Sequence, residues 1–205
     1  MRTELRPAAV LLGLLLLAAG APVPAAAQDS RIAARLPAGL AGEIQRLVDS
    51  ASAVGLPSEP LVLKALEGSS KGADSGRIVL AVRQLAARLD ASRRELGPAS
   101  TEPELVAAAA ALRAGATPSA LHALRGLRRG RPLVVPLSVL ADLLGAGVPA
   151  SEAWSSVEAI AASGAADAEF LQLRDRLTVG AAAPGLPPRG ERTPLPGADA
   201  GTPRP

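Results

Sequence analysis

Cysteine is absent from the 205-residue chain, and histidine occurs once, at His122. These two facts exclude disulfides, thiolate nucleophiles, cysteine zinc sites, iron–sulfur clusters and multi-histidine metal sites. The two aromatic residues, Trp154 and Phe170, are too few for the stacking platforms that bind single-stranded nucleic acid. We therefore expect no cofactor, no metal site and no nucleic-acid partner.

β-Branched residues are also few, because 24 Val, Ile and Thr stand against 78 Ala and Leu. Ala and Leu favour helices, whereas β-branched residues favour strands. Charge is nearly balanced, with 22 basic and 19 acidic residues, and all but two of the basic residues are Arg. The composition predicts an all-α protein without the strong positive charge of a nucleic-acid-binding domain.

The N-terminus has the order of an export signal. Arg2 and Arg6 precede an uncharged run at 8–19, and the small residues 25–27 follow two prolines. This order predicts a signal peptide over 1–27, cleaved after Ala27, and hence a periplasmic or secreted protein. The run is shorter than the about 20 apolar residues of a membrane span, so a retained N-terminal anchor is the alternative. Membrane contact is expected only through an uncleaved signal or through the protein surface.

The C-terminal segment 180–205 differs from the body, because 12 of its 26 residues are Pro or Gly and it has no apolar period. Such a segment buries little surface, so we expect a disordered tail. Its functional alternatives are a spacer and a proline-motif ligand. The remaining segment, 28–179, is expected to form one helical domain.

Apolar residues in the body recur at helical spacing. The clearest case is a helix expected over 74–96, where Ile78, Val82, Leu85 and Leu89 share one face. Gly97 and Pro98 end it. Further helices are expected at 40–54, 58–68, 102–114, 118–129, 136–145, 150–163 and 167–179.

Three similar turns, each with Gly followed by Pro, occur at 54–57, 114–118 and 146–149. Gly accepts the left-handed conformation that ends a helix, and Pro suits the start of the next. The flanking segments 44–74, 105–132 and 137–167 therefore predict antiparallel αα-hairpin units. Both a short α-solenoid-like array and an irregular helical bundle fit this pattern.

The most polar part of the body is the segment 64–74, directly before the long helix. It holds four candidate binding residues, Lys64, Ser69, Ser70 and Lys71. A glycine-containing loop that opens a helix can bind an anion, although the order of a phosphate loop is missing here. The alternative is a capping loop that joins two helices.

A second candidate is the basic segment 121–132. His122, Arg125 and Arg129 are spaced to share a helix face, and Arg128 and Arg131 lie close by. Leu121, Leu124 and Leu127 are expected on the opposite, core-facing side. Such a face would suit an anionic envelope partner or an acidic protein, and a merely solvated face is the alternative.

Trp154 is flanked by Glu152 and Glu158. Two carboxylates beside an aromatic ring can form a glycosidase site, but sugar sites usually contain several aromatics. Trp154 and Phe170 are therefore expected to fill the core, with a Trp that faces a partner as the alternative.

Taken together, the sequence predicts a non-enzymatic, exported binding or scaffolding protein. An envelope hydrolase with a carboxylate pair and an anionic-surface-binding protein are the alternatives.

Overall fold

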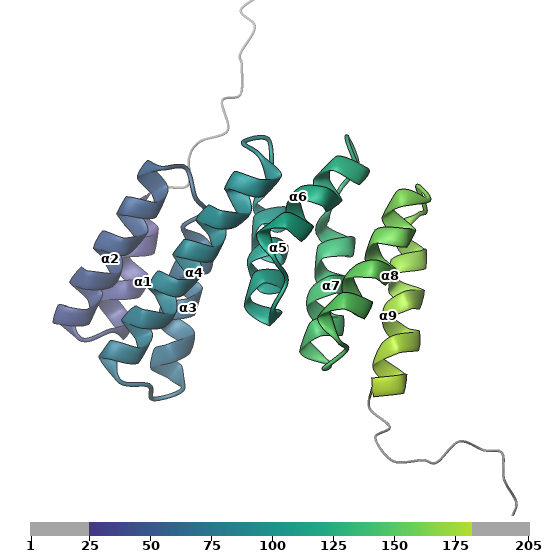
Figure 1. Ribbon diagram of the computed structural model, residues 1–205. Coiled ribbons are helices and arrows are strands. Elements are labelled where there is room, and N and C mark those ends of the chain that lie inside the picture. Colours follow the sequence, from purple (N-terminus) through teal and green to yellow (C-terminus); the bar gives the residue numbers. More distant parts are fainter. Residues whose placement is uncertain (1–24, 182–205) are drawn as a thin grey trace, which may run out of the picture.

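The computed structural model describes residues 25–181, and these residues form helices joined by short turns (Figure 1). The helices are α1 (Ala25–Arg35), α2 (Ala38–Ala53), α3 (Glu59–Ser70), α4 (Ser75–Leu96), α5 (Glu102–Ala114), α6 (Pro118–Leu127), α7 (Val134–Gly145), α8 (Ala150–Ala162) and α9 (Asp167–Ala181). The all-α fold expected from composition is confirmed. None of these helices is both long and apolar enough to span a membrane.

Helix α1 was not expected from the sequence. It buries Ile32, and Leu36 directly after it is also buried, while Arg31 donates two hydrogen bonds to Glu59 at 2.9 and 2.6 Å. Two buried apolar residues are too few to show the repeating apolar pattern from which a helix is predicted. The helix begins at Ala25, three residues before the expected mature N-terminus, so cleavage after Ala27 stays a prediction. The apolar run at 8–19 lies outside the described residues.

The helices form a two-layered array. In one layer α2, α4, α6 and α8 lie side by side, and in the other α1 contacts α3 while α5, α7 and α9 are neighbours (Figure 1). Helix α4 packs against both α3 and α5 and so connects the two halves of the second layer. This is the array alternative of the sequence analysis, because each helix contacts its neighbours along the row rather than one central core.

All three expected units are pairs of consecutive helices, but only two of them run in the same direction between the layers. The turns at Gly115 and Gly147 lead from the α5–α7–α9 layer to the α6–α8 layer, whereas the turn at Gly55 leads in the opposite direction, from α2 to α3. The segment 44–74 therefore contains the expected pair of helices, but the pair begins in the other layer and is not a spatial repeat of the other two. Similar turn chemistry arises wherever two antiparallel helices are joined, so it does not show which layer comes first.

The helix ends use the expected local chemistry. The Asp74 carboxylate accepts from the backbone N–H of Arg77, and Thr101 and Glu104 form a reciprocal capping box. Gly115 and Gly147 have φ values of 113° and 86°, the left-handed region that glycine enters without steric cost. Helix α9 continues to Ala181, two residues into the expected tail, and 182–205 lies outside the described residues.

The buried side chains form two clusters. One extends from Ile32 on α1 to Ala109 on α5, and the other from Leu96 at the end of α4 to Leu173 on α9. Phe170 is completely buried in the second cluster, as expected. Trp154 packs against the same cluster but is only half-buried, so it is not a full core residue.

Candidate binding site

The polar segment 64–74 forms the end of α3 and the turn to α4. Glu67 accepts from Lys64 at 2.9 Å and also from Lys71, and the two ammonium groups lower the pKa of Glu67 to about 2. Ser70 donates to the Glu67 carbonyl at 2.9 Å, and Ser69 donates to the Arg35 carbonyl at 3.3 Å. Each candidate group thus has an intramolecular partner, as in a capping loop. Anion binding at this loop stays a prediction.

The basic segment has a different geometry from the one expected. Helix α6 ends at Leu127, two residues early, so Leu127 is 42 % exposed and Arg128 turns inward to 1 % exposure. Arg128 donates to Asp167 at 2.7 Å and to the Ala165 carbonyl at 3.1 Å, and its guanidinium lies 5.0 Å from the Phe170 ring centroid. The expectation of an exposed Arg128 opposite a buried Leu127 was wrong.

Arg131 and Arg125 are also engaged within the molecule. Arg131 donates to the carbonyls of Gly164 and Ala165 at 2.7 and 2.9 Å. Arg125 donates to the carboxylate of Glu104 at 3.1 Å. The predicted continuous basic face is therefore corrected: Arg128 and Arg131 hold the turn before α9, and Arg125 pairs with Glu104 of α5.

His122 and Arg129 remain on the surface. His122 is 76 % exposed, with its Nδ1 3.6 Å from Glu95, and Arg129 is exposed without an ion pair to a described residue. Two separated groups provide much less positive potential than the five that the sequence suggested.

Glu104 is the buried acid of the same region, with 5 % exposure. Its carboxylate accepts backbone N–H bonds from Thr101 and Leu133, both at 3.0 Å, besides the bond from Arg125. Burial alone would raise the pKa of Glu104, but these three donors outweigh burial and hold the pKa below its usual range. The carboxylate thereby ties the start of α5 to the start of α7.

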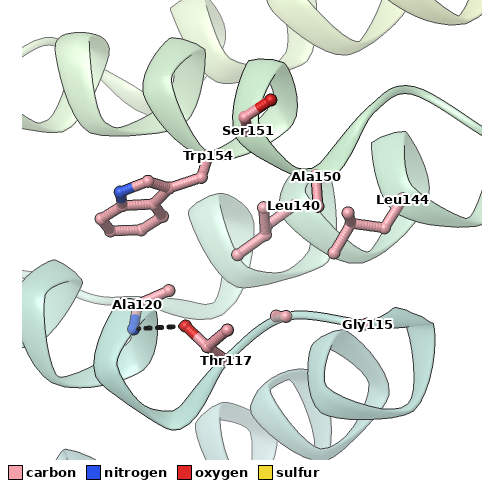
Figure 2. Close-up of a pocket in the computed structure, with 9 residues that line it drawn as sticks. Gly115, Thr117, Ala120, Leu140, Leu144, Ala150, Ser151 and Trp154 are labelled. Carbon is pink, nitrogen blue, oxygen red and sulfur yellow. Dashed lines mark hydrogen bonds between the residues drawn. The ribbon is translucent and has the colours of Figure 1, made fainter.

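An apolar cavity of about 230 Å³ lies at the other end of α6 and α7. Figure 2 shows Trp154 of α8 extending over it toward Ala120 of α6, with Leu140 and Leu144 of α7 on a third side. Its lining residues come from the α5–α6 turn, the start of α6, the end of α7 and the start of α8: Gly115, Ala116, Thr117, Ala120, Leu140, Leu144, Ala150, Ser151 and Trp154. The small side chains leave the space that the indole ring partly covers. We call this the Trp154 cavity.

Some of the polar groups around this cavity have a hydrogen-bond partner within the protein, and others have none among the described residues. Thr117 accepts from the backbone N–H of Ala120 at 3.2 Å, so its hydroxyl caps α6. The indole N–H of Trp154 and the hydroxyl of Ser151 make no hydrogen bond to a described residue. An indole N–H is only a donor, so Trp154 offers an incoming group an apolar surface and one hydrogen bond.

A second cavity, of about 340 Å³, lies beside the first, on the other side of the start of α8. It is formed by the α7–α8 turn together with Glu152 of α8 and the side chains of Arg176 and Leu177 on α9. Glu152 and Arg176 bring one charge of each sign, and neither has an ion pair with a described residue. Glu158, the other acid expected to flank Trp154, lines neither cavity.

Comparison of the chain with protein-family models, with curated proteins and with solved structures found no match. Within residues 25–181 no three His, Asp or Glu side chains come together as metal ligands. The function of the protein is therefore inferred from the chemistry of the site itself.

The sequence contained the signals for the Trp154 cavity, although no single one of them predicts it. The turns at 115–118 and 147–149 both precede a helix of the same layer, so they lie at the same end of the array. Gly115 and Ala116 in the first of these turns, together with the single tryptophan near the start of the helix that follows the second turn, mark an apolar space at that end. The second cavity depends on where α9 packs, which no local pattern indicates.

Proposed function

We propose that the protein is an exported, non-enzymatic helical binding or scaffolding protein, and that the Trp154 cavity is its contact site. The half-buried indole over an apolar cavity supports this most directly. Tryptophan is among the residues that contribute most at protein interfaces when a partner covers it. Cavities for drug-sized ligands usually measure about 300–1,000 Å³, so a space of about 230 Å³ suits one or two side chains of a protein partner better.

The site would act by shape and burial rather than by charge. A partner's apolar side chain would enter between Ala120, Leu140 and Trp154, where it would displace water from apolar surface. The Trp154 N–H would donate to a backbone carbonyl of the partner and so fix its orientation. Since Arg125, Arg128 and Arg131 are engaged inside the molecule, the continuous basic face that favoured an anionic partner is not formed.

A filled cavity tests the proposal. Ala150 lies exposed at the rim, so Ala150→Phe would occupy the space without disturbing the core. Ala162→Phe is the matched control, since Ala162 is exposed at the opposite end of the same helix. Each purified variant is immobilised, envelope extract of the source cell is passed over it, and retained proteins are quantified by mass spectrometry.

We expect wild type and Ala162→Phe to retain the same partner, and Ala150→Phe to lose it by about tenfold or more, the effect of a disrupted interface hot spot. Circular dichroism of both variants checks the fold. Equal retention by all three proteins would contradict a contact site at this cavity.

Export is tested separately by the mass of the native protein, which should correspond to a chain that starts at Gln28.

A further inference from the structure

We propose that the chain's own proline-rich segment 184–192, PGLPPRGER, occupies the Trp154 cavity. The inference deepens the proposed function and rests on its assignment of this cavity as a binding site. Residues 182–205 lie outside the described part of the chain, so only their sequence and the place where α9 ends are used. Three observations support this occupant: the chemistry of the cavity, the reach of the chain and the charges on both sides.

The chemistry of the cavity suits proline. Proline-rich ligands dock their rings against aromatic side chains in a polyproline helix, which exposes carbonyls that have no internal partner. The Trp154 cavity offers an indole face, an indole N–H without a described partner, and apolar walls from Leu140 and Leu144. Pro187 and Pro188 are adjacent in this segment, so their rings would lie close together and one of them would face the indole.

The end of α9 places the segment within reach. Leu177 lines the second cavity, and Ala181 lies one helical turn beyond it, about 6 Å further along the axis. From the second cavity to the Trp154 cavity the chain must cross only the start of α8, a helix about 10–12 Å in diameter. Residues 182–187 would extend about 19 Å as a polyproline helix, which covers the total of about 16–18 Å and would bring Pro187 to the Trp154 cavity.

The charges on the two sides are complementary. Glu152 and Arg176 line the second cavity and have no ion pair with a described residue. Arg189 and Glu191 follow the prolines, two residues apart and of opposite sign. With Pro187 at Trp154, the long side chain of Arg189 would reach around the start of α8 to the exposed carboxylate of Glu152. Such pairing sets register and orientation more than it adds affinity.

Tethering favours this occupant over others. A short covalent connection gives an effective concentration in the millimolar range, so a weak contact would still be mostly formed. A partner that uses the same cavity would have to displace the segment.

The single tryptophan provides the test, because fluorescence of the full chain comes from Trp154 alone. Acrylamide quenching is measured for wild type, for the double variant Pro187→Ala/Pro188→Ala, and for the matched control Pro194→Ala/Pro196→Ala. We expect the first variant to be quenched at least about twofold more strongly than wild type, and the control to equal wild type. Equal quenching of all three proteins would overturn the proposal.

Charge reversal and dilution test the register and the tether. Glu152→Arg and Arg189→Glu should each raise quenching, and the two together should restore the wild-type value. A combined variant as quenchable as either single variant would overturn the pairing.

The protection of Trp154 from quenching should also be unchanged from about 1 to 100 μM protein, far below the effective concentration of a tethered segment. Protection that grows with concentration would assign the cavity to the tail of a second copy and overturn the intramolecular contact.

The quenching experiment tests the tail contact and the retention experiment tests the binding function, so each claim can be contradicted without the other. Protection of Trp154 by the tail without retention of any partner would leave the cavity with an internal occupant alone, and the proposed binding function would be wrong. Retention that depends on Ala150, without protection by the tail, would keep the binding function and remove the tail from it.

Discussion

Single charged residues hold the turns at one end of the array. Glu104 accepts from the backbone of Leu133, and Arg128 and Arg131 donate to the turn before α9. The α6–α7 turn is therefore attached on one side to α5 and on the other to the α8–α9 turn. Hydrogen bonds that involve charged groups contribute more than neutral ones, so these few side chains are important for stability.

Arg128→Met should destabilise the protein by about 2–3 kcal/mol, because it leaves Asp167 and the Ala165 carbonyl without their donor. Arg129→Met is the matched control: the neighbouring side chain is exposed and should change stability by no more than about 0.5 kcal/mol. Urea denaturation followed by circular dichroism measures both. Equal stability of the two variants would show that Arg128 is not a structural residue.

The lowered pKa of Glu104 predicts a loss of stability in acid. A carboxyl group whose pKa is lower in the folded state contributes stability above its unfolded pKa of about 4.3, and this contribution disappears as pH falls through the folded pKa. Glu104→Gln should therefore have a shallower decline of melting temperature between pH 6 and pH 3 than wild type. Glu102→Gln, a change at an exposed acid of the same helix, should keep the wild-type slope. Parallel slopes for wild type and Glu104→Gln would contradict the ionised, hydrogen-bonded carboxylate.

The burial of Arg128 could not be predicted from the local sequence pattern. Spacing placed Leu127 with Leu121 and Leu124, which is correct only while the helix continues. Helix α6 ends at Leu127, and the turn that follows rotates Arg128 into the core. The partners of Arg128 are 37 and 39 residues away, so no short-range signal marks this arginine as buried.

At the scale of helices, the position of a glycine decides whether that glycine ends the helix or weakens it. Gly115 is left-handed and ends α5, whereas Gly126 lies inside α6. A Cβ atom added at either glycine would meet no heavy atom within 4 Å, so packing does not distinguish them. Only the backbone conformation differs.

Substitution by alanine should therefore have opposite effects at these two glycines. Gly115→Ala should destabilise the protein by about 1 kcal/mol, because φ is 113° there. Gly126→Ala should stabilise it by about 0.5–1 kcal/mol, the gain in helix propensity. Thermal melts of the two variants measure the sign directly. A stabilised Gly115→Ala protein would contradict the left-handed end of α5.

Helix positions were largely predictable because caps, glycines and prolines act within a few residues. The helix start at Thr101 and the helix end at Gly97 were both identified in this way. The layer to which each helix belongs was not predictable from the turns, as Gly55 shows. That assignment depends on which neighbours bury the apolar face, and this is a property of the assembled array.

At the scale of the whole molecule, two core clusters share one array. Each helix contacts only its neighbours, so local damage should spread little along the row. Phe170→Ala removes a completely buried ring and should destabilise α7, α8 and α9 by about 3–5 kcal/mol. Hydrogen exchange should therefore accelerate in these helices and remain unchanged in α1 to α3. Leu171→Ala, a change at an exposed neighbour, is the control. Uniform acceleration along the chain would indicate one cooperative core instead.

The two ends of the array differ in chemistry. Charged side chains fasten the turns where α5, α7 and α9 begin, while the end where α6 and α8 begin has an apolar cavity under the only tryptophan. Arg128 and Arg131 at the charged end thereby have internal partners. The apolar end is where a further chain segment would gain most from burial.

Photo-crosslinking at the rim of the Trp154 cavity tests the central claim most directly. A photoreactive amino acid is placed at position 150 in the full chain, or at position 162 as the control, and the protein is irradiated in its native cells. We expect a crosslink from position 150 to a proline-rich segment, residues 184–192 of the chain or a partner that displaces them, and no such crosslink from position 162. Equal yields at both positions, or no crosslink at position 150, would contradict a binding site at this cavity.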